Sequence, residues 1–271
     1  MWLISRRVLL TGVLPAGLLR LNSRADANDR AEARRAIAAL ERRHGGRIGV
    51  AILNAAGNSL ITHRGDERFA LCSTFKFLAA AFVLARVDRG DENLARRIVY
   101  ERDYLVPYCP VTGRHADGGG LTVGEICAAA MILSDNTAAN LLLDNFVGPA
   151  ALTRYARLLG DNVTRLDRRE PDLNEATPGD PRDTTSPVAM LGLLGETVLG
   201  TALSAASREK LTAWLTANKT GDKQLRAGVP GDWRVGDKTG SGAHAVANDI
   251  AVIWPPADHH HGLLRGFSRV E

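Results

Sequence analysis

The sequence predicts an α+β protein in which an antiparallel sheet, flanked by an N-terminal helix, is joined to an all-helical domain. Segments with strand character lie near both ends of the chain, at 47–65 and 232–256. The segments between them have the apolar spacing and the start signals of helices. Strands separated by a run of helices are typical of a sheet that receives a helical insertion. The 271 residues, 45% of them hydrophobic, can bury a sizeable core.

The first 27 residues predict an export signal peptide. The pair Arg6-Arg7 precedes a short apolar run, and small residues end the segment at 25–27. The paired arginines indicate the twin-arginine route. The alternative is a membrane anchor, but Arg20 interrupts the apolar run before the roughly 20 residues that a span needs. We therefore expect an exported protein, periplasmic or extracellular, that has no membrane contact after removal of the signal.

The charge balance gives no reason to expect a nucleic-acid partner. The formal net charge is +4, but the four arginines and one aspartate of the leader contribute +3, which leaves +1 for the rest. The three cysteines, Cys72, Cys109 and Cys127, are an odd number at no metal spacing. The histidines show no ligand spacing either. We expect no metal, no cofactor and no dependence on a disulfide.

The elements follow in a regular order. A helix over 28–44 ends at two glycines, and the run 47–65 forms two strands around an Ala-Gly-Asn turn, which predicts a hairpin. Thr122 and Glu125 form a capping box that starts a helix over 122–133. Further helices are expected over 73–88, 136–146, 149–159, 187–200 and 205–218, and strands over 232–240 and 247–256.

The polar stretch 161–185 has no clear periodicity and contains the run TPGDP. It is too long for an ordinary connection, so we expect a functional loop. The domain boundaries that follow are a sheet domain of 28–66 and 216–256, a helical domain of 67–215 with an active-site loop at 165–183, and an atypical tail of 257–271.

Ser73 and Lys76 lie in an otherwise apolar helical segment, LCSTFKFLAAAFVL. The spacing places both side chains one turn apart on one face. A serine hydroxyl needs a nearby base to act as a nucleophile, and an apolar wall disfavours the ammonium form of a lysine. The alternative is a lysine whose long side chain reaches water. The pair by itself does not distinguish a catalytic lysine from a lysine whose side chain reaches water.

Two further triplets have ordinary structural explanations when taken singly. Ser134-Asp135-Asn136 begins a predicted helix, where these residue types cap the first turn. Lys238-Thr239-Gly240 ends a predicted strand, where glycine is typical of a turn. Their order after Ser73-x-x-Lys76 changes the interpretation, because these three motifs together characterise class A β-lactamases and penicillin-binding proteins.

The chain resembles a class A serine β-lactamase from about residue 30 to Pro256. Besides the three motifs, the runs RLDRREPDLNEA and RDTTSP match the loop that carries the hydrolytic glutamate of class A enzymes. The resemblance implies a β-lactamase/transpeptidase-like fold with the active site between the sheet and the helical domain. It also implies a monomer that hydrolyses a small-molecule β-lactam, such as a penicillin or a cephalosporin, and thereby gives antibiotic resistance.

The resemblance assigns four catalytic roles. Ser73 would attack the lactam carbonyl and form an acyl-enzyme, while Lys76 would pass protons within the site. Ser134 would give a proton to the leaving lactam nitrogen. Glu170 would activate the water that removes the acyl group. Whether Glu170 or Lys76 activates Ser73 stays open.

The resemblance also assigns binding and structural roles. The backbone N–H groups of Ser73 and Ser241 would form the oxyanion hole. An ion pair between Arg168 and Asp183 would hold the loop, and Glu170-Pro171 would be a cis bond. The substrate-binding residues implied are Asn136, Asn174, Lys238, Thr239, Ser241 and Tyr108.

Two departures from the family pattern concern substrate and fold. No arginine lies on the strand after Lys238, and Gln224 occupies another place where relatives carry one. In the family, one more strand beside the N-terminal strand and a long helix follow Pro256. The 15 residues of the tail cannot supply both, so we expect that strand to be missing. Unpaired backbone groups on its neighbours would each cost about 1–3 kcal/mol and leave a poorly folded chain.

Two alternatives to a β-lactam hydrolase remain at this point. A penicillin-binding D,D-peptidase shares the serine-lysine chemistry, but it lacks the water-holding pair that Glu170 and Asn174 suggest. A truncated, non-catalytic remnant is the second alternative, and it depends on the missing C-terminal elements. The substrate spectrum is not predicted by the sequence.

Overall fold

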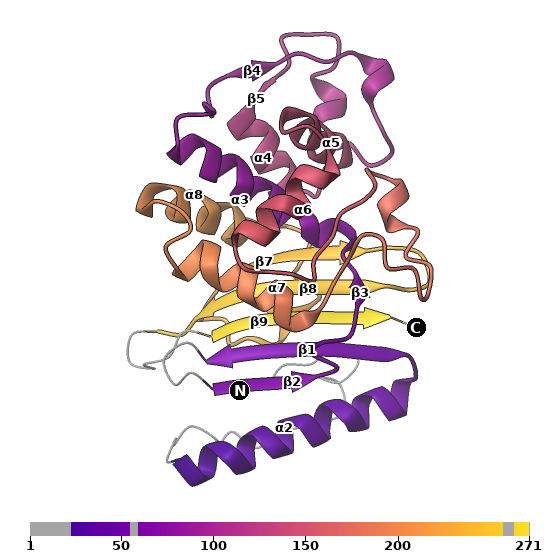
Figure 1. Cartoon of the computed structure of the whole chain (residues 1–271), viewed down its shortest axis with the longest axis vertical. Coiled ribbons are helices and arrows are strands. Elements are labelled where there is room, and N and C mark those ends of the chain that lie inside the picture. The colour runs from indigo at the N-terminus through magenta and orange to yellow at the C-terminus, as the bar shows by residue number, and fades with distance from the viewer. Residues whose placement is uncertain (1–22, 55–58, 257–262, 271) are drawn as a thin grey trace.

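A computed structural model describes residues 23–54, 59–256 and 263–270 of the chain (Figure 1). Five strands form one antiparallel sheet in the order β2-β1-β9-β8-β7, so strands from both ends of the chain meet in it. These strands are β1 (Arg47–Asn54), β2 (Ser59–His63), β7 (Arg234–Ser241), β8 (Ala247–Trp254) and β9 (Leu263–Val270). The predicted α+β class is confirmed.

The expectation that the sheet lacks a strand beside β1 is wrong. β9 pairs with β1 from Arg47↔Val270 to Asn54↔Leu263, and its other edge pairs with β8. Fifteen residues are too few for a strand and a long helix together, but they suffice for the eight residues of β9, and a central strand is held chiefly by backbone pairing. Leu, Phe and Val in this stretch have strand propensity, and the unpaired groups of both neighbours favour any extended segment that reaches them. No helix follows β9 among the described residues.

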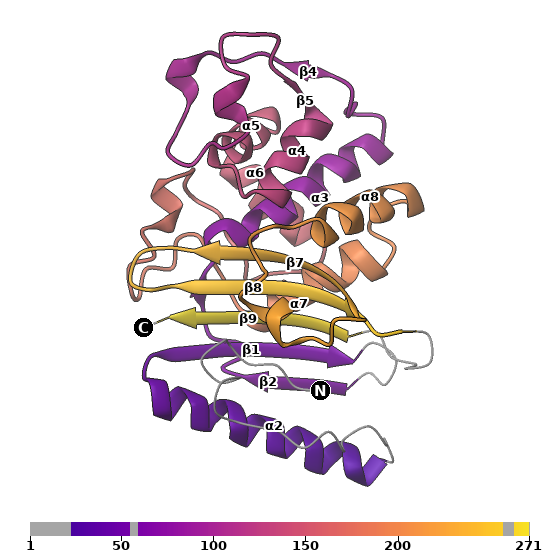
Figure 2. The ribbon, with the colours of Figure 1, turned by 180° about the vertical axis from the view of Figure 1, so that it is seen from behind.

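The predicted export signal lies mostly outside the described residues, which begin at Ser23. The first described helix, α2 (Ser23–His44), begins before the expected start at 28 and crosses the expected end of the signal. Ala33, Ile37 and Leu40 lie on one face of α2, at helical spacing, and pack against alternate residues of β1 and against β2. Both views place α2 beside β2, at the opposite end of the molecule from the short strands β4 (Arg97–Ile98) and β5 (Leu121–Thr122) (Figures 1 and 2).

The helices between β2 and β7 fall close to their predicted ranges. Thr122 caps α4 in the predicted capping box, and Pro149 begins α6. The predicted helix over 187–200 ends earlier, because a π-helical turn occupies Gly195–Leu199. The helices are α3 (Phe75–Asp88), α4 (Val123–Ile132), α5 (Asn136–Asn145), α6 (Pro149–Leu158), α7 (Pro187–Leu194) and α8 (Ala205–Thr216).

The loops of this region contain short elements that the sequence did not predict. Two-residue strands pair on either side of the helices: β3 (Phe69–Ala70) with β6 (Thr184–Thr185), and β4 (Arg97–Ile98) with β5 (Leu121–Thr122). A 3₁₀ turn, η1 (Cys72–Thr74), precedes α3, and another, η4 (Asp172–Asn174), lies in the loop predicted over 161–185.

The sheet and the helices share one hydrophobic core. Its largest cluster contains buried residues of every helix from α3 to α8 together with Ala51 of β1 and Ile250 and Val252 of β8. α3 lies at the centre, since ten of its 14 residues are buried. No described helix has the length and apolarity that a bilayer crossing requires. The shared core fixes α3, and with it the first chemical motif, against the sheet.

A proline in β9 tests whether this strand completes the sheet. Gly266 lies opposite Ala51 of β1 and Ile250 of β8, so Gly266→Pro removes a donor in the middle of the sheet. We expect the free energy of unfolding, measured by urea denaturation, to fall by about 3 kcal/mol or more. Ser59→Pro is the control, because proline is tolerated at the first residue of an edge strand. Equal losses in both variants would contradict the placement of β9.

Candidate active site

Ser73 lies in the 3₁₀ turn η1, immediately before α3, and its exposed fraction is 9%. The α-helix itself starts at Phe75, two residues later than predicted. Cys72 has φ +43°, in the left-handed region that non-glycine residues rarely adopt. Its thiol is fully buried, and burial raises its pKa to about 12, so it remains protonated. The turn therefore presents Ser73 at the edge of the core, while Cys72 packs inside as a small hydrophobe.

Lys76 is completely buried, which excludes the alternative that its side chain reaches water. Its Nζ donates to the Ser134 carbonyl at 2.7 Å and to Asn136 Oδ1 at 2.6 Å. It also lies 2.9 Å from Glu170 Oε1 and 3.4 Å from Ser134 Oγ. Burial lowers the pKa of Lys76, and the carboxylate of Glu170 opposes that shift. The amine therefore has partners from two other segments of the chain.

Glu170 brings the loop to the same place. Its carboxylate is buried, with Oε1 3.3 Å from Ser73 Oγ, and its Oε2 accepts a hydrogen bond from Asn174 Nδ2. Asn140 of α5 holds the backbone of Glu170 on both sides, because its Oδ1 accepts from the Glu170 N–H at 3.0 Å and its Nδ2 donates to the Glu170 carbonyl at 2.9 Å. The Glu170-Pro171 bond is cis.

The triplet 134–136 combines a cap with a polar centre. Asp135 is the N-cap of α5 and accepts from the Ala138 N–H at 2.8 Å, as the structural explanation predicts. Ser134 has φ +60°, and its Oγ accepts a hydrogen bond from Lys238 Nζ at 3.1 Å. The cap and the polar centre thus use different residues of one motif.

Lys238 is fully buried on β7 and faces the hydroxyl of Ser134. Its Nζ donates to Ser134 Oγ and, at 2.7 Å, to the Thr239 carbonyl. Burial, together with the nearby charge of Lys76, lowers the pKa of Lys238 to about 7. Thr239 Oγ1 lies 2.5 Å from Thr220 Oγ1, so Thr220 borders the site although no sequence motif includes it.

Gly240 allows β7 to approach the turn that carries Ser73. A Cβ atom at this position would lie 3.0 Å from the Leu71 carbonyl oxygen and 3.1 Å from the N–H nitrogens of Ser73 and Thr74. The glycine therefore permits a close approach, and the predicted turn is not its role. Ser241, the last residue of β7, is exposed beside it.

Tyr108 lies at the exposed rim of the helical side. It has φ +65°, its side chain is 59% exposed, and its carbonyl accepts from the Asn136 N–H at 2.9 Å. Asn136 Nδ2 also donates to the Pro107 carbonyl at 2.9 Å. These bonds fix the Tyr108 segment to the first turn of α5.

The loop over 165–183 is held at its far end by a buried carboxylate. Arg168 Nε lies 2.6 Å from Asp183 Oδ2, and Asp183 Oδ1 accepts from the N–H groups of Asp167 and Arg168. The side chain of Asp183 is 1% exposed, so these bonds satisfy an otherwise costly buried charge. Within the described residues there is no group of three or more His, Cys, Asp or Glu side chains suited to a metal ion.

The structure thus brings Ser73, Lys76, Ser134, Asn136, Glu170, Asn174, Lys238 and Thr239 into one polar cluster. Asn140 and Thr220 also belong to it, and neither residue was predicted from the sequence. Asn140 had a signal, because it lies four residues after Asn136 on the same helix. Thr220 had none, because its neighbour Thr239 is distant in sequence.

Gly240→Ala tests the close approach of β7. We expect the added methyl group to push β7 away from Ser73 and to lower the free energy of unfolding by about 1–3 kcal/mol, as overpacking does. Gly231→Ala is the control, because no atom lies within 4 Å of its added Cβ. Chemical denaturation measures both variants, and equal effects would argue against a tight contact at Gly240.

Comparison with known proteins identifies the family. A model of the β-lactamase enzyme family matches residues 32–263. The Escherichia coli β-lactamase Toho-1 is 47% identical over 261 residues, which cover 96% of this chain and 88% of the relative. The E. coli β-lactamase CTX-M-97 is 50% identical over 226 residues, 83% of this chain and 77% of the relative. The solved structure of an ancestral class A β-lactamase is 60% identical in sequence and superposes with a TM-score of 0.86. The match covers 88% of this chain and 90% of the ancestral chain. The chain therefore belongs to the β-lactamase enzyme family, as a class A serine β-lactamase.

Proposed function

We propose that the chain hydrolyses the amide bond of β-lactams such as penicillins and cephalosporins, through an acyl-enzyme on Ser73. The single observation that carries the proposal is the position of the Glu170 carboxylate. It lies within 3.3 Å of the Ser73 hydroxyl and 2.9 Å of the Lys76 ammonium, and Asn174 donates to its other oxygen. A nucleophile, a proton carrier and a base are thus in reach of one another.

Acylation begins with removal of the Ser73 proton. Glu170 accepts a hydrogen bond from this hydroxyl, whereas Lys76 has a pKa lowered by burial, so both can act as the base. Ser73 Oγ then attacks the lactam carbonyl carbon. The backbone N–H groups of Ser73 and Ser241 donate hydrogen bonds that stabilise the negative charge developing on the carbonyl oxygen.

Ring opening requires a proton on the lactam nitrogen, and Ser134 is suited to supply it. Its hydroxyl contacts both lysine ammonium groups, at 3.4 Å to Lys76 and 3.1 Å to Lys238. A proton given to the substrate is replaced through these contacts. Lys238, Thr239 and Ser241 would bind the substrate carboxylate, Asn136 its side-chain amide, and Tyr108 would form a wall at the rim.

Deacylation returns the enzyme to its starting state. Glu170 and Asn174 hold a water molecule, Glu170 takes its proton, and the resulting hydroxide attacks the ester carbon on Ser73. The bond between this carbon and Ser73 Oγ then breaks, and the proton held by Glu170 returns to Ser73 Oγ, 3.3 Å away, as the carboxylic acid product leaves. This pair also argues against a D,D-peptidase, which has no such water-holding residues. The grounds for a non-catalytic remnant were the missing C-terminal strand and helix, and the presence of β9 in the sheet speaks against the first of them.

We also propose that the protein acts outside the cytoplasmic membrane as a monomer and gives resistance to β-lactam antibiotics. Arg6-Arg7, the apolar run that follows and the small residues at 25–27 support export through the twin-arginine route. No cofactor or metal enters the proposed reaction.

Replacement of Glu170 separates the two half-reactions. In Glu170→Gln we expect the penicilloyl adduct on Ser73 to persist, with deacylation slowed by about 10²–10⁴-fold, because the water loses its base. Intact-protein mass spectrometry after mixing with a penicillin measures the adduct. Asp172→Asn, an exposed carboxylate on the same loop, is the control and should clear the adduct like the parent. A persistent adduct in the parent would select the peptidase, and no adduct in a folded parent would select the remnant.

The pH dependence tests Lys238. Its pKa near 7 means that the ammonium that binds the substrate carboxylate is lost as the pH rises above about 7. We therefore expect kcat/KM for a carboxylate-bearing β-lactam to fall along an alkaline limb with that pKa. In Lys238→Arg the limb should disappear from this range, because arginine stays charged. The same limb in both enzymes would assign it to another group.

A further inference from the structure

Three polar residues follow one another at four-residue spacing along α5: Asn136, Asn140 and Asp144. This spacing places them on one face of the helix. Asn136 binds the Lys76 ammonium, and Asn140 binds the backbone of Glu170. Asp144 continues the series one turn further on, at the other end of the helix from the site.

We propose that Asp144, Arg169 and Tyr104 form a positioning cluster that holds Glu170 in place for deacylation. The inference rests on the proposed function. Arg169 directly precedes Glu170 in the loop, and none of the three residues contacts the Ser73 hydroxyl or substrate in the proposed reaction. Their role is to fix where the Glu170 carboxylate lies.

The three side chains form a closed ring of hydrogen bonds. Arg169 Nη1 pairs with Asp144 Oδ1, and Arg169 Nη2 donates to the Tyr104 hydroxyl at 2.8 Å. Tyr104 in turn donates its proton to Asp144 Oδ2. Burial and the adjacent Asp144 raise the pKa of Tyr104, so the phenol remains a donor. Each side chain thus hydrogen-bonds to the other two, and both Nη atoms of the planar guanidinium are engaged.

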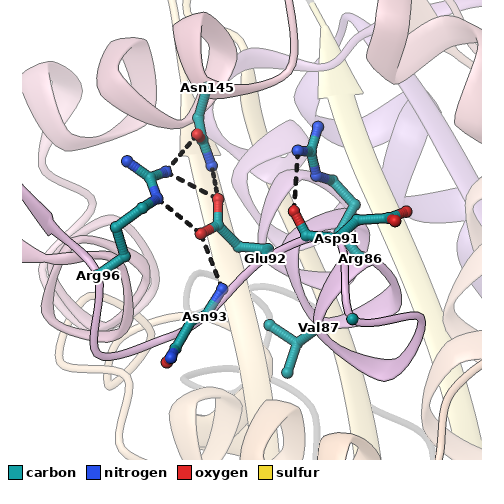
Figure 3. A pocket seen from close by; sticks show the side chains of 8 residues that line it. Arg86, Val87, Asp91, Glu92, Asn93, Arg96 and Asn145 are labelled. Carbon is teal, nitrogen blue, oxygen red and sulfur yellow. Dashed lines mark hydrogen bonds and ion pairs between the residues drawn. The ribbon is translucent and has the colours of Figure 1, made fainter.

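The far end of α5, which carries Asp144, is itself fixed by a second cluster. Asn145 Nδ2 donates to Glu92 Oε2 at 2.6 Å, and Arg96 donates to both oxygens of Glu92 at 2.8 Å (Figure 3). Hydrogen bonds from Arg96 lower the pKa of Glu92 to about 2, so this carboxylate is charged at any working pH. Asp144 is therefore presented from an anchored helix end.

The exposed ion pair of this cluster contributes little to the free energy of folding, so we assign it a positioning role. The side chains of Arg169 and Asp144 are 39% and 43% exposed, and exposed ion pairs contribute little to folding. Arg169 Nη2 also donates to the carbonyl of Asn140 at 3.4 Å, and the side chain of this same residue binds the Glu170 backbone. A displacement of about 1 Å at a catalytic group can reduce a rate by about 10²-fold.

The test measures how fast the Ser73 adduct clears. Arg169→Gln and Asp144→Asn should each slow deacylation by about 5- to 50-fold. Mass spectrometry during a single turnover measures the loss of the adduct with time. The melting temperature should stay near that of the parent. The double variant should be no more than about twofold slower than the slower single variant, because both remove one interaction. Tyr104→Phe, which keeps the ring and removes the hydroxyl, should slow deacylation in the same direction.

Arg165→Gln is the matched control. Arg165 lies in the same loop, is 41% exposed and pairs with Asp167 rather than with α5. It should deacylate at the parent rate. Unchanged deacylation in Arg169→Gln and Asp144→Asn, or equal slowing in Arg165→Gln, would overturn the positioning role while the parent still turns over. A parent that forms no adduct, or never clears it, would instead overturn the proposed function and this inference with it.

Discussion

The burial of the Lys76 ammonium is the constraint on which the rest of the site depends. A cationic group without solvent contact costs several kcal/mol unless it is paired and hydrogen-bonded. Its partners come from the start of α5, through the Ser134 carbonyl and Asn136, and from the loop, through Glu170. Neither segment can move far without leaving a charge unpaired in the core. The polar cluster is therefore held by the same packing that holds α3, and its geometry is a consequence of the folded helical region.

The sheet determines where this helical region meets β7. α7 packs against β1 and β9, and the shared core joins β1 and β8 to α3. β9 supplies backbone partners to both of its neighbours, so the strands from the two ends of the chain form one continuous surface. On that surface Gly240 lets the edge strand approach the turn of Ser73. Lys238 and Ser134, which are 104 residues apart, become neighbours by this route.

Much of the helical region could be predicted, because local signals decide it. The capping box at Thr122, the proline at the start of α6 and the apolar spacing are properties of short segments. β9 could not be predicted in this way, because a central strand depends on two partners that are distant in sequence. The contacts of Asn140, Thr220 and Arg169 depend equally on neighbours brought together by folding. Of these, only Asn140 had a periodic signal.

The sequence by itself determined which chemical groups the protein has and in what order, since a nucleophile, two lysines, a carboxylate and their motifs are covalent facts. It also determined where most helices begin, because caps act within one turn. The tertiary structure alone decided that Lys76 is shielded from solvent and that the pKa of Lys238 falls to about 7. It also decided that one face of α5 contacts both Lys76 and the loop that carries Glu170. The physical reason is that desolvation and charge pairing depend on distances in space, which local sequence does not specify.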